Sequence, residues 1–208
     1  MPEPRFSDSR IADAQPVVIQ TGMTAELYFT LAESSQPQNL IDGLLYVSPP
    51  PTDQHEDLVL ALAEALAAWA RERGGRVFVQ RPCWLADTTV IEPDVLYLAP
   101  GRSHLAGRFV RGAPDLAVEV VSTATAAFDN EAKFAAYGKH GVREAWFVDP
   151  QTRTVTVVCG DGQAWRSERT VDFGEAIPSE MVDLGTGNLE RAGETAARGF
   201  SRSRPLRW

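Results

Sequence analysis

The chain has 208 residues, of which 44% are hydrophobic, and its 28 acidic and 20 basic side chains give a formal charge of −8. This length suits one sizeable domain with a packed core, and the acidic balance argues against binding nucleic acid over a broad basic surface, although a local basic patch remains compatible with it. Arginine supplies 18 of the basic residues, so the positions of the two lysines, Lys133 and Lys139, are informative.

No segment of the sequence is expected to enter a membrane. The longest apolar run, residues 58–70, includes Glu64 and is too short and too polar to span a bilayer. The first 18 residues lack the apolar region of a signal peptide, so we expect a cytoplasmic protein. Cys83 and Cys159 do not have the spacing of a zinc site, and both are expected to be thiols of the core.

The first predicted elements follow a polar stretch that contains several prolines. Residues 23–33 predict a short helix with Thr24 as its cap. Residues 41–51 predict a strand with a turn at Asp42 and Gly43, and three prolines end it because they cannot donate to a β-ladder.

The clearest helical pattern begins at Asp53, which we expect to cap the helix with Glu56 three residues later, and it ends at Gly74 and Gly75. His55 falls within the same arc of the helix as the apolar residues, so its imidazole is expected to face the core. The apolar stripe consists of Leu58, Leu62, Ala65, Leu66 and Trp69.

Residues 76–86 and 88–100 predict two central strands, and the second is apolar on both faces apart from Glu92 and Asp94. A loop with three arginines leads into a third strand around Glu119. The remaining pattern predicts a helix over residues 125–140 that Gly141 ends, a strand over residues 142–150, and a hairpin over residues 154–168.

This order predicts an α/β or α+β domain around a mixed central sheet that helices flank, with extra strands near both ends. We expect residues 21–185 to form a single domain. Residues 1–20 and 186–208 are expected to be flexible segments.

Two carboxylates interrupt the apolar strands. Glu119 stands in the middle of DLAVEVVS, and Asp94 lies 25 positions earlier on the preceding predicted strand. An ionised carboxylate is costly to bury unless a cation or several donors meet it. If the two strands pair, both carboxylates converge, and such oxygen ligands suit Mg²⁺ or Mn²⁺, which could activate water beside a phosphodiester.

The sequence resembles the Uma2 family, a domain of unknown function within the PD-(D/E)XK nuclease superfamily. The resemblance covers residues 23–158, about two-thirds of the chain. Its motifs are TAELYF, IDG, SPPP followed by His55, PDV at 93–95, EV followed by Ser122, Asp129 and Lys133, Tyr137, GV at 141–142 and WFVDP.

The resemblance implies a restriction-endonuclease-like core with the order αβββαβ. It also implies that Asp94 and Glu119 hold a divalent metal ion while a lysine orients or deprotonates the attacking water. The sequence departs from that superfamily pattern at Val121, which stands where the lysine is expected. Lys133 resembles a replacement on the following helix, although a local ion pair with Asp129 is the simpler explanation for this lysine.

A second departure lies upstream, where family members usually carry glutamate and this chain has Asn39. Asp42 is a weak substitute that can instead simply form the turn. Glu92 shares a strand face with Asp94 and could be an outer ligand. Tyr137 is expected to pack its helix on the sheet, with contact to substrate as the alternative.

His55 could complete the site as a metal ligand, proton shuttle or phosphate donor, or it could be a buried histidine bonded to a backbone carbonyl. The loop before Glu119 carries three arginines that could bind DNA phosphates, Arg102, Arg108 and Arg111. A second cluster of arginines could bind phosphates in the same way. The second cluster consists of Arg71, Arg73, Arg76 and Arg81.

These observations favour a Mg²⁺- or Mn²⁺-dependent endonuclease that cuts DNA, with Asp94 and Glu119 as metal ligands and Lys133 and His55 assisting. One alternative is an inactive protein of the same fold that binds nucleic acid or a protein partner, with a homodimer as one form. Another is a structural domain in which Lys133 neutralises Glu119.

Overall fold

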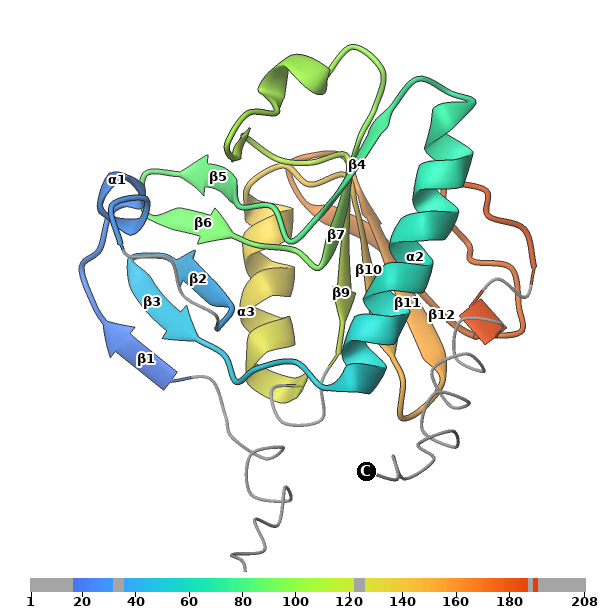
Figure 1. Cartoon of the computed structure of the whole chain (residues 1–208), viewed down its shortest axis with the longest axis horizontal. Coiled ribbons are helices and arrows are strands. Elements are labelled where there is room, and N and C mark those ends of the chain that lie inside the picture. The colour runs from blue at the N-terminus through green and yellow to red at the C-terminus, as the bar shows by residue number, and fades with distance from the viewer. Residues whose placement is uncertain (1–16, 32–35, 122–125, 187–188, 191–208) are drawn as a thin grey trace, which may run out of the picture.

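The computed structural model describes residues 17–31, 36–121, 126–186 and 189–190, with residue 17 and residues 126–130 described by their backbone alone. It contains two six-stranded mixed sheets (Figure 1). Within the described residues, the helices are α1 (Ala25–Tyr28), α2 (Asp53–Arg71), α3 (Ala126–Lys139) and a short 3-10 turn, Ser103–Leu105.

The first sheet, called sheet A, has two edge strands, β1 and β8, and all its neighbouring strands are antiparallel except β5 and β8. Its order is β1 (Val17–Gln20), β3 (Leu44–Val47), β2 (Gln38–Ile41), β6 (Thr89–Ile91), β5 (Cys83–Ala86) and β8 (Val110–Arg111).

The second sheet, called sheet B, ends in β12 on one side and β4 on the other, and its only parallel pair among the described strands is β9 with β10. Its order is β12 (Trp165–Asp172), β11 (Thr154–Gly160), β10 (Glu144–Asp149), β9 (Leu116–Val120), β7 (Val95–Leu98) and β4 (Arg76–Val79).

The two long helices cover opposite faces of sheet B, and α3 also reaches sheet A (Figure 1). Leu62 and Leu66 of α2 belong to the same core cluster as Val118 of β9. Tyr137 of α3 belongs to a second cluster that includes Ala117 of β9 and Ile41 of β2. Because side chains alternate along a strand, Glu119 faces the side of sheet B that α3 covers.

The structure confirms the expected mixed α/β class, but it divides the two expected central strands. Residues 76–86 form β4 and β5, which Gln80 and Pro82 separate, and residues 88–100 form β6 and β7, which Pro93 separates. Gln80 has a φ of 45°, and a proline cannot donate to a ladder, so pairing stops at each point. In both cases, one half joins sheet A and the other half joins sheet B.

The local signals differ in how closely they match the structure. The Asp42–Gly43 turn is confirmed, with φ of 49° and 80° at its two residues, as is the left-handed Gly141 after α3. The cap of α2 is Thr52 rather than the expected Asp53, because the Thr52 hydroxyl accepts a hydrogen bond from the His55 N–H.

The chain ends fall largely outside the described residues. Residues 17–20 of the expected N-terminal segment form β1, and Leu189 of the expected C-terminal tail is buried. None of the described helices is both long and apolar enough to cross a membrane.

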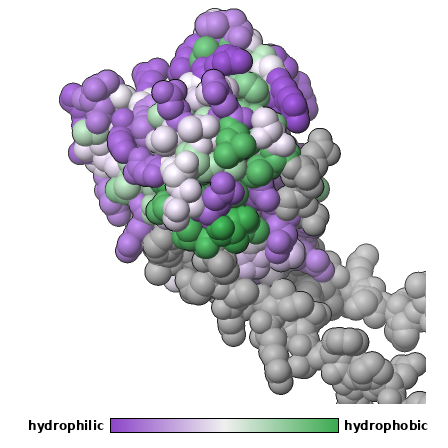
Figure 2. Space-filling view, turned by 90° about the vertical axis from the view of Figure 1, so that its left-hand side faces the viewer, coloured by the Kyte–Doolittle hydropathy of each residue, from purple (hydrophilic) through white to green (hydrophobic). Residues whose placement is uncertain are grey.

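Figure 2 views the molecule from the side of sheet A and shows apolar residues gathered in one region of that face. The exposed large apolar side chains of β1 and α1 are Val18, Ile19 and Leu27.

Candidate functional site

Glu119 is 3% exposed, and two side chains of α3 donate to its carboxylate. The Lys133 ammonium lies 2.8 Å from Oε2, and the Tyr137 hydroxyl donates to Oε1. Burial raises the pKa of Glu119 to about 7, and the charge of Asp94 acts in the same direction, while the charge of Lys133 and the two hydrogen bonds act in the opposite direction. The charge in this apolar strand is therefore met by one cation and one hydroxyl donor.

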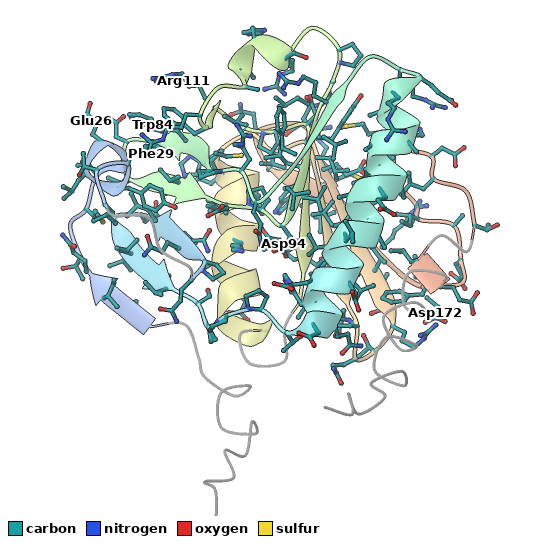
Figure 3. The ribbon with its side chains drawn as sticks, in the orientation of Figure 1. Glu26, Phe29, Trp84, Asp94, Arg111 and Asp172 are labelled. Atoms are coloured by element: carbon teal, nitrogen blue, oxygen red, sulfur yellow. The ribbon has the colours of Figure 1, made fainter. Side chains whose placement is uncertain are left out.

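Asp94 lies at the junction between β6 and β7 (Figure 3). The strands β7 and β9 pair as expected, with Val95 opposite Val118, and this register brings the residue before Val95 next to Glu119. The Val120 N–H donates to Asp94 Oδ2 at 2.8 Å. Oδ1 has no hydrogen-bond partner among the described residues, and the Asp94 side chain is 15% exposed.

His55 contacts this aspartate from the first turn of α2. Its Nε2 lies 3.2 Å from Asp94 Oδ2, so a carboxylate takes the place of the backbone carbonyl that the sequence offered as one alternative. Burial lowers the pKa of His55, but the hydrogen bond and charge of Asp94 outweigh burial, and the pKa rises above its usual value. The Nδ1 atom is buried without a partner in the described part of the chain.

Glu92 lies two residues before Asp94, and its environment favours the neutral carboxyl. Burial raises the pKa of Glu92 to about 7, with Lys133 lowering it and Asp94 raising it. The side-chain oxygen of Asn39, which is 1% exposed, accepts the Glu92 N–H at 2.9 Å. Asn39 therefore fixes the backbone that leads into the site.

Asp42, which the sequence offered as a weak substitute for the upstream glutamate, has other surroundings. Asp42 sits in an exposed turn, where its carboxylate lies 2.7 Å from the Lys139 ammonium. Ser122 and the side chain of Asp129 lie outside the described residues, so the expected ion pair between Asp129 and Lys133 has no structural description.

The contact between Tyr137 and Glu119 was not anticipated from the sequence. A signal was present, because Tyr137 follows Lys133 by four residues and such residues share a helix face. Both side chains therefore reach the same carboxylate from neighbouring turns of α3.

The arginines before β9 lie away from the carboxylates. The chain leaves Asp94 along β7 and returns toward Glu119 along β9, so residues 99–115 join the far ends of these strands. Arg102 donates to the buried Asp115 at 2.8 Å and to the Ala113 carbonyl at 2.9 Å. Arg108 and Arg111 instead line a surface pocket of about 310 Å³.

The oxygen atoms of Asp94 and Glu119 are of the kind that a hard divalent cation prefers. Asp94 Oδ1 has no partner in the described chain, and each Glu119 oxygen keeps a lone pair after it accepts one hydrogen bond. No three His, Cys, Asp or Glu side chains of the described residues are grouped so that they could hold a metal ion. A cation here would take its remaining ligands from water or substrate, as Mg²⁺ commonly does.

Solved structures that are similar to this chain include one from Anabaena variabilis and one of a DNA complex, and no curated protein matches it. One is a crystal structure of a protein described as a "putative nuclease" from Anabaena variabilis, with 19% identity, 82% of this chain and 99% of that chain covered, and a TM-score of 0.71. The other, a cryo-electron microscopy structure of a DrdV–DNA complex, has 18% identity, covers 73% of this chain and 13% of that chain, and has a TM-score of 0.34, too low for a structural argument.

The similarity to the Anabaena protein confirms the expected nuclease-like fold. A family model for Uma2, described as "Putative restriction endonuclease", matches residues 25–187. This match spans well over half of the sequence, and the chain therefore belongs to the Uma2 family.

Proposed function

We propose that this protein is a divalent-metal-dependent endonuclease that hydrolyses phosphodiester bonds of DNA, with Asp94 and Glu119 as the metal ligands. The observation that carries this proposal is the uncommitted Oδ1 of Asp94 beside the buried carboxylate of Glu119. Membership of a family described as restriction endonucleases and the nuclease-like fold support the same class of reaction.

In this proposal, the neighbouring side chains hold the two carboxylates in place. Lys133 and Tyr137 fix both oxygens of Glu119, and His55 and the Val120 N–H hold Asp94 through Oδ2, which leaves Oδ1 available. A bound Mg²⁺ or Mn²⁺ would lower the pKa of a water molecule and offset negative charge on the phosphate. The ammonium of Lys133, 2.8 Å from Glu119 Oε2, can stabilise negative charge next to Glu119.

A specific observation favours a second candidate, a nuclease-fold protein that binds nucleic acid or a protein partner without cutting. The Lys133 ammonium and the Tyr137 hydroxyl already engage both oxygens of Glu119, and Val121 stands where the superfamily lysine is expected. In that case, Lys133 neutralises Glu119 and has no role in catalysis.

Calorimetric titration with Mg²⁺ and with Mn²⁺, followed by plasmid nicking in the same samples, tests the proposal. We expect wild type to bind the ion and nick the plasmid, and we expect Asp94→Asn and Glu119→Gln to lose both properties. Asp172→Asn is the matched control, since it removes one exposed carboxylate of β12 and should behave as wild type.

If the folded wild-type protein binds neither ion, the proposal of a metal-dependent endonuclease is wrong and the second candidate is favoured. Ion binding that survives in both site variants would place the ion elsewhere. Ion binding without nicking would show that the protein has a cation site but does not cut DNA, which contradicts the proposed endonuclease.

A further inference from the structure

Four arginines on one surface have no carboxylate partner among the described residues. Among the other described arginines, Arg73, Arg102, Arg143 and Arg166 each lie within 4.0 Å of a carboxylate oxygen, whereas Arg71, Arg153 and Arg169 do not. The four arginines, which we call the arginine face, are Arg76, Arg81, Arg108 and Arg111.

Contacts between side chains and backbone join the first half of this face to the loop before β9. The guanidinium groups of Arg76 and Arg81 lie over the Phe78 ring, at 4.6 and 4.9 Å from its centroid. Arg81 also donates to the Gly107 carbonyl. This bond connects the link between β4 and β5 to the loop that carries Arg108.

The second half lies on β8 and the same loop (Figure 3). The Arg111 guanidinium lies 4.9 Å from the centroid of Phe109 and 5.4 Å from that of Trp84. Phe109 stacks on Phe29 of the segment after α1, with centroids 4.2 Å apart. Phe109 and Arg111 also line the pocket of about 310 Å³, together with residues 104–108.

The stacked guanidinium groups are prepared to bind phosphate. An arginine that lies on a ring has little rotamer freedom left to lose, and its N–H groups still point outward in the plane of the guanidinium. Residues 71–111 carry seven arginines and four carboxylates, whereas the whole chain has 20 basic and 28 acidic residues. Positive charge is therefore concentrated near this face of an otherwise acidic protein.

We propose that the arginine face binds the phosphate backbone of duplex DNA, at a place separate from Asp94 and Glu119. The nature of the ligand rests on the proposed function, and the location rests on the contacts above. Arg76 lies opposite Leu98, at the end of β7 away from Asp94, and Arg108 and Arg111 belong to the segment that joins the far ends of β7 and β9. Arg81 is nearer the carboxylates, because it follows Gln80, whose N–H donates to the Asp94 carbonyl. A duplex bound here is held at a distance from the bond that is cut. The arginine face therefore determines the affinity for DNA, and the carboxylates of Asp94 and Glu119 determine the rate of hydrolysis.

Fluorescence anisotropy with a labelled DNA duplex in EDTA tests the face without any divalent ion. For the double variant Arg76→Ala/Arg111→Ala, we expect the affinity for the duplex to fall about tenfold. The slope of log K against log salt concentration should also decrease in magnitude, by about one for each phosphate that the protein no longer neutralises. Arg108→Ala should also weaken binding. Its guanidinium has no ring contact among the described residues, so a fold defect would not explain the weaker binding.

Arg169→Ala is the matched control, because it removes the same charge from β12, at the opposite edge of sheet B from β4. We expect it to bind as wild type. Equal losses of affinity in Arg169→Ala and in the face variants would mean that overall charge sets the affinity, and this outcome would overturn the proposal. Unchanged binding in the face variants would overturn it as well.

The same samples separate this inference from the proposed function. Asp94→Asn should bind the duplex in EDTA as wild type does. With Mg²⁺ and saturating DNA, the double variant should cut at the wild-type rate, with a raised KM. If wild type binds DNA through the arginine face but does not cut it, the proposed endonuclease function is wrong and the proposal for the face stands. If wild type cuts DNA and the face variants bind it normally, the proposal for the face is wrong and the endonuclease function stands.

Discussion

At Glu119, the ammonium of Lys133 lies 2.8 Å from one carboxylate oxygen, and the two side chains are 4% and 10% exposed. Breaking a buried pair from one side leaves a charge without its counter-charge. We therefore expect Glu119→Gln to lower the free energy of unfolding by about 3 kcal/mol in urea denaturation.

The double variant Glu119→Gln/Lys133→Met is the control for this first prediction, because it removes both charges. It should lose less stability than the two single variants added together. Strict additivity would show that the two side chains do not stabilise each other.

Glu92 predicts a pH dependence. Its pKa is raised from the usual 4.5 to about 7, so the folded protein holds the proton more tightly than the unfolded chain does. The stability that the protonated group contributes is present below pH 4.5 and is lost as the pH rises to about 7. Relative to Glu92→Gln, wild type should lose about 1 kcal/mol over this window, a value reduced for partial exposure. Urea unfolding at several pH values measures it, and parallel curves for the two proteins would contradict it.

The sequence allowed some of these residues to be predicted and not others. Asp94 and Glu119 stood out because each interrupts an apolar strand, and the pairing of β7 with β9 follows from their order. The partner of Arg102 could not be predicted, because Asp115 reaches it only through the fold of the loop. The choice of Tyr137 as a donor likewise depends on how α3 docks on sheet B.

At the scale of elements, the start of α2 carries a prediction. The Thr52 hydroxyl accepts the His55 N–H at 3.3 Å, so this cap fixes the turn from which His55 reaches Asp94. Thr52→Ala should cost about 1 kcal/mol in urea unfolding, whereas Thr52→Ser should cost a few tenths because it keeps the acceptor. Equal losses of stability in both variants would show that the hydroxyl is not the stabilising group.

The helices were predicted more closely than the strands. The apolar stripe of α2 and the glycine after α3 are local signals that tertiary contacts do not change. The breaks at Pro82 and Pro93 were visible in the sequence, but β-propensity is equally high on both sides of each break. Which half joins which sheet depends on pairing with distant strands, and no short stretch of sequence contains that information.

At the scale of the whole molecule, another buried carboxylate, Glu144, holds the segment after β12 against sheet B. Glu144 is 1% exposed and accepts hydrogen bonds from Trp146 Nε1 at 2.6 Å, the Glu180 N–H at 3.0 Å and the Ser179 hydroxyl. Glu144→Ala would leave the buried Trp146 Nε1 and the two other donors without this acceptor. We expect it to cost about 3 kcal/mol and to expose residues 177–182 to limited proteolysis.

Glu144→Gln is the control for this fourth prediction, since it keeps one acceptor oxygen and should lie between Glu144→Ala and wild type. Resistance of residues 177–182 to protease in Glu144→Ala would show that other contacts hold the segment.

The break at Pro93 has a mechanical consequence. The link that carries Asp94 leaves sheet A at β6 and enters sheet B at β7, whereas Glu119 belongs wholly to sheet B. The gap between the two carboxylates therefore depends on the angle at which the sheets meet, and a tilt of sheet A would pull on Asp94 through this link. The strand β8, which carries Arg111, is an edge of sheet A. A ligand that moved this edge would therefore change the distance between the carboxylates of Asp94 and Glu119.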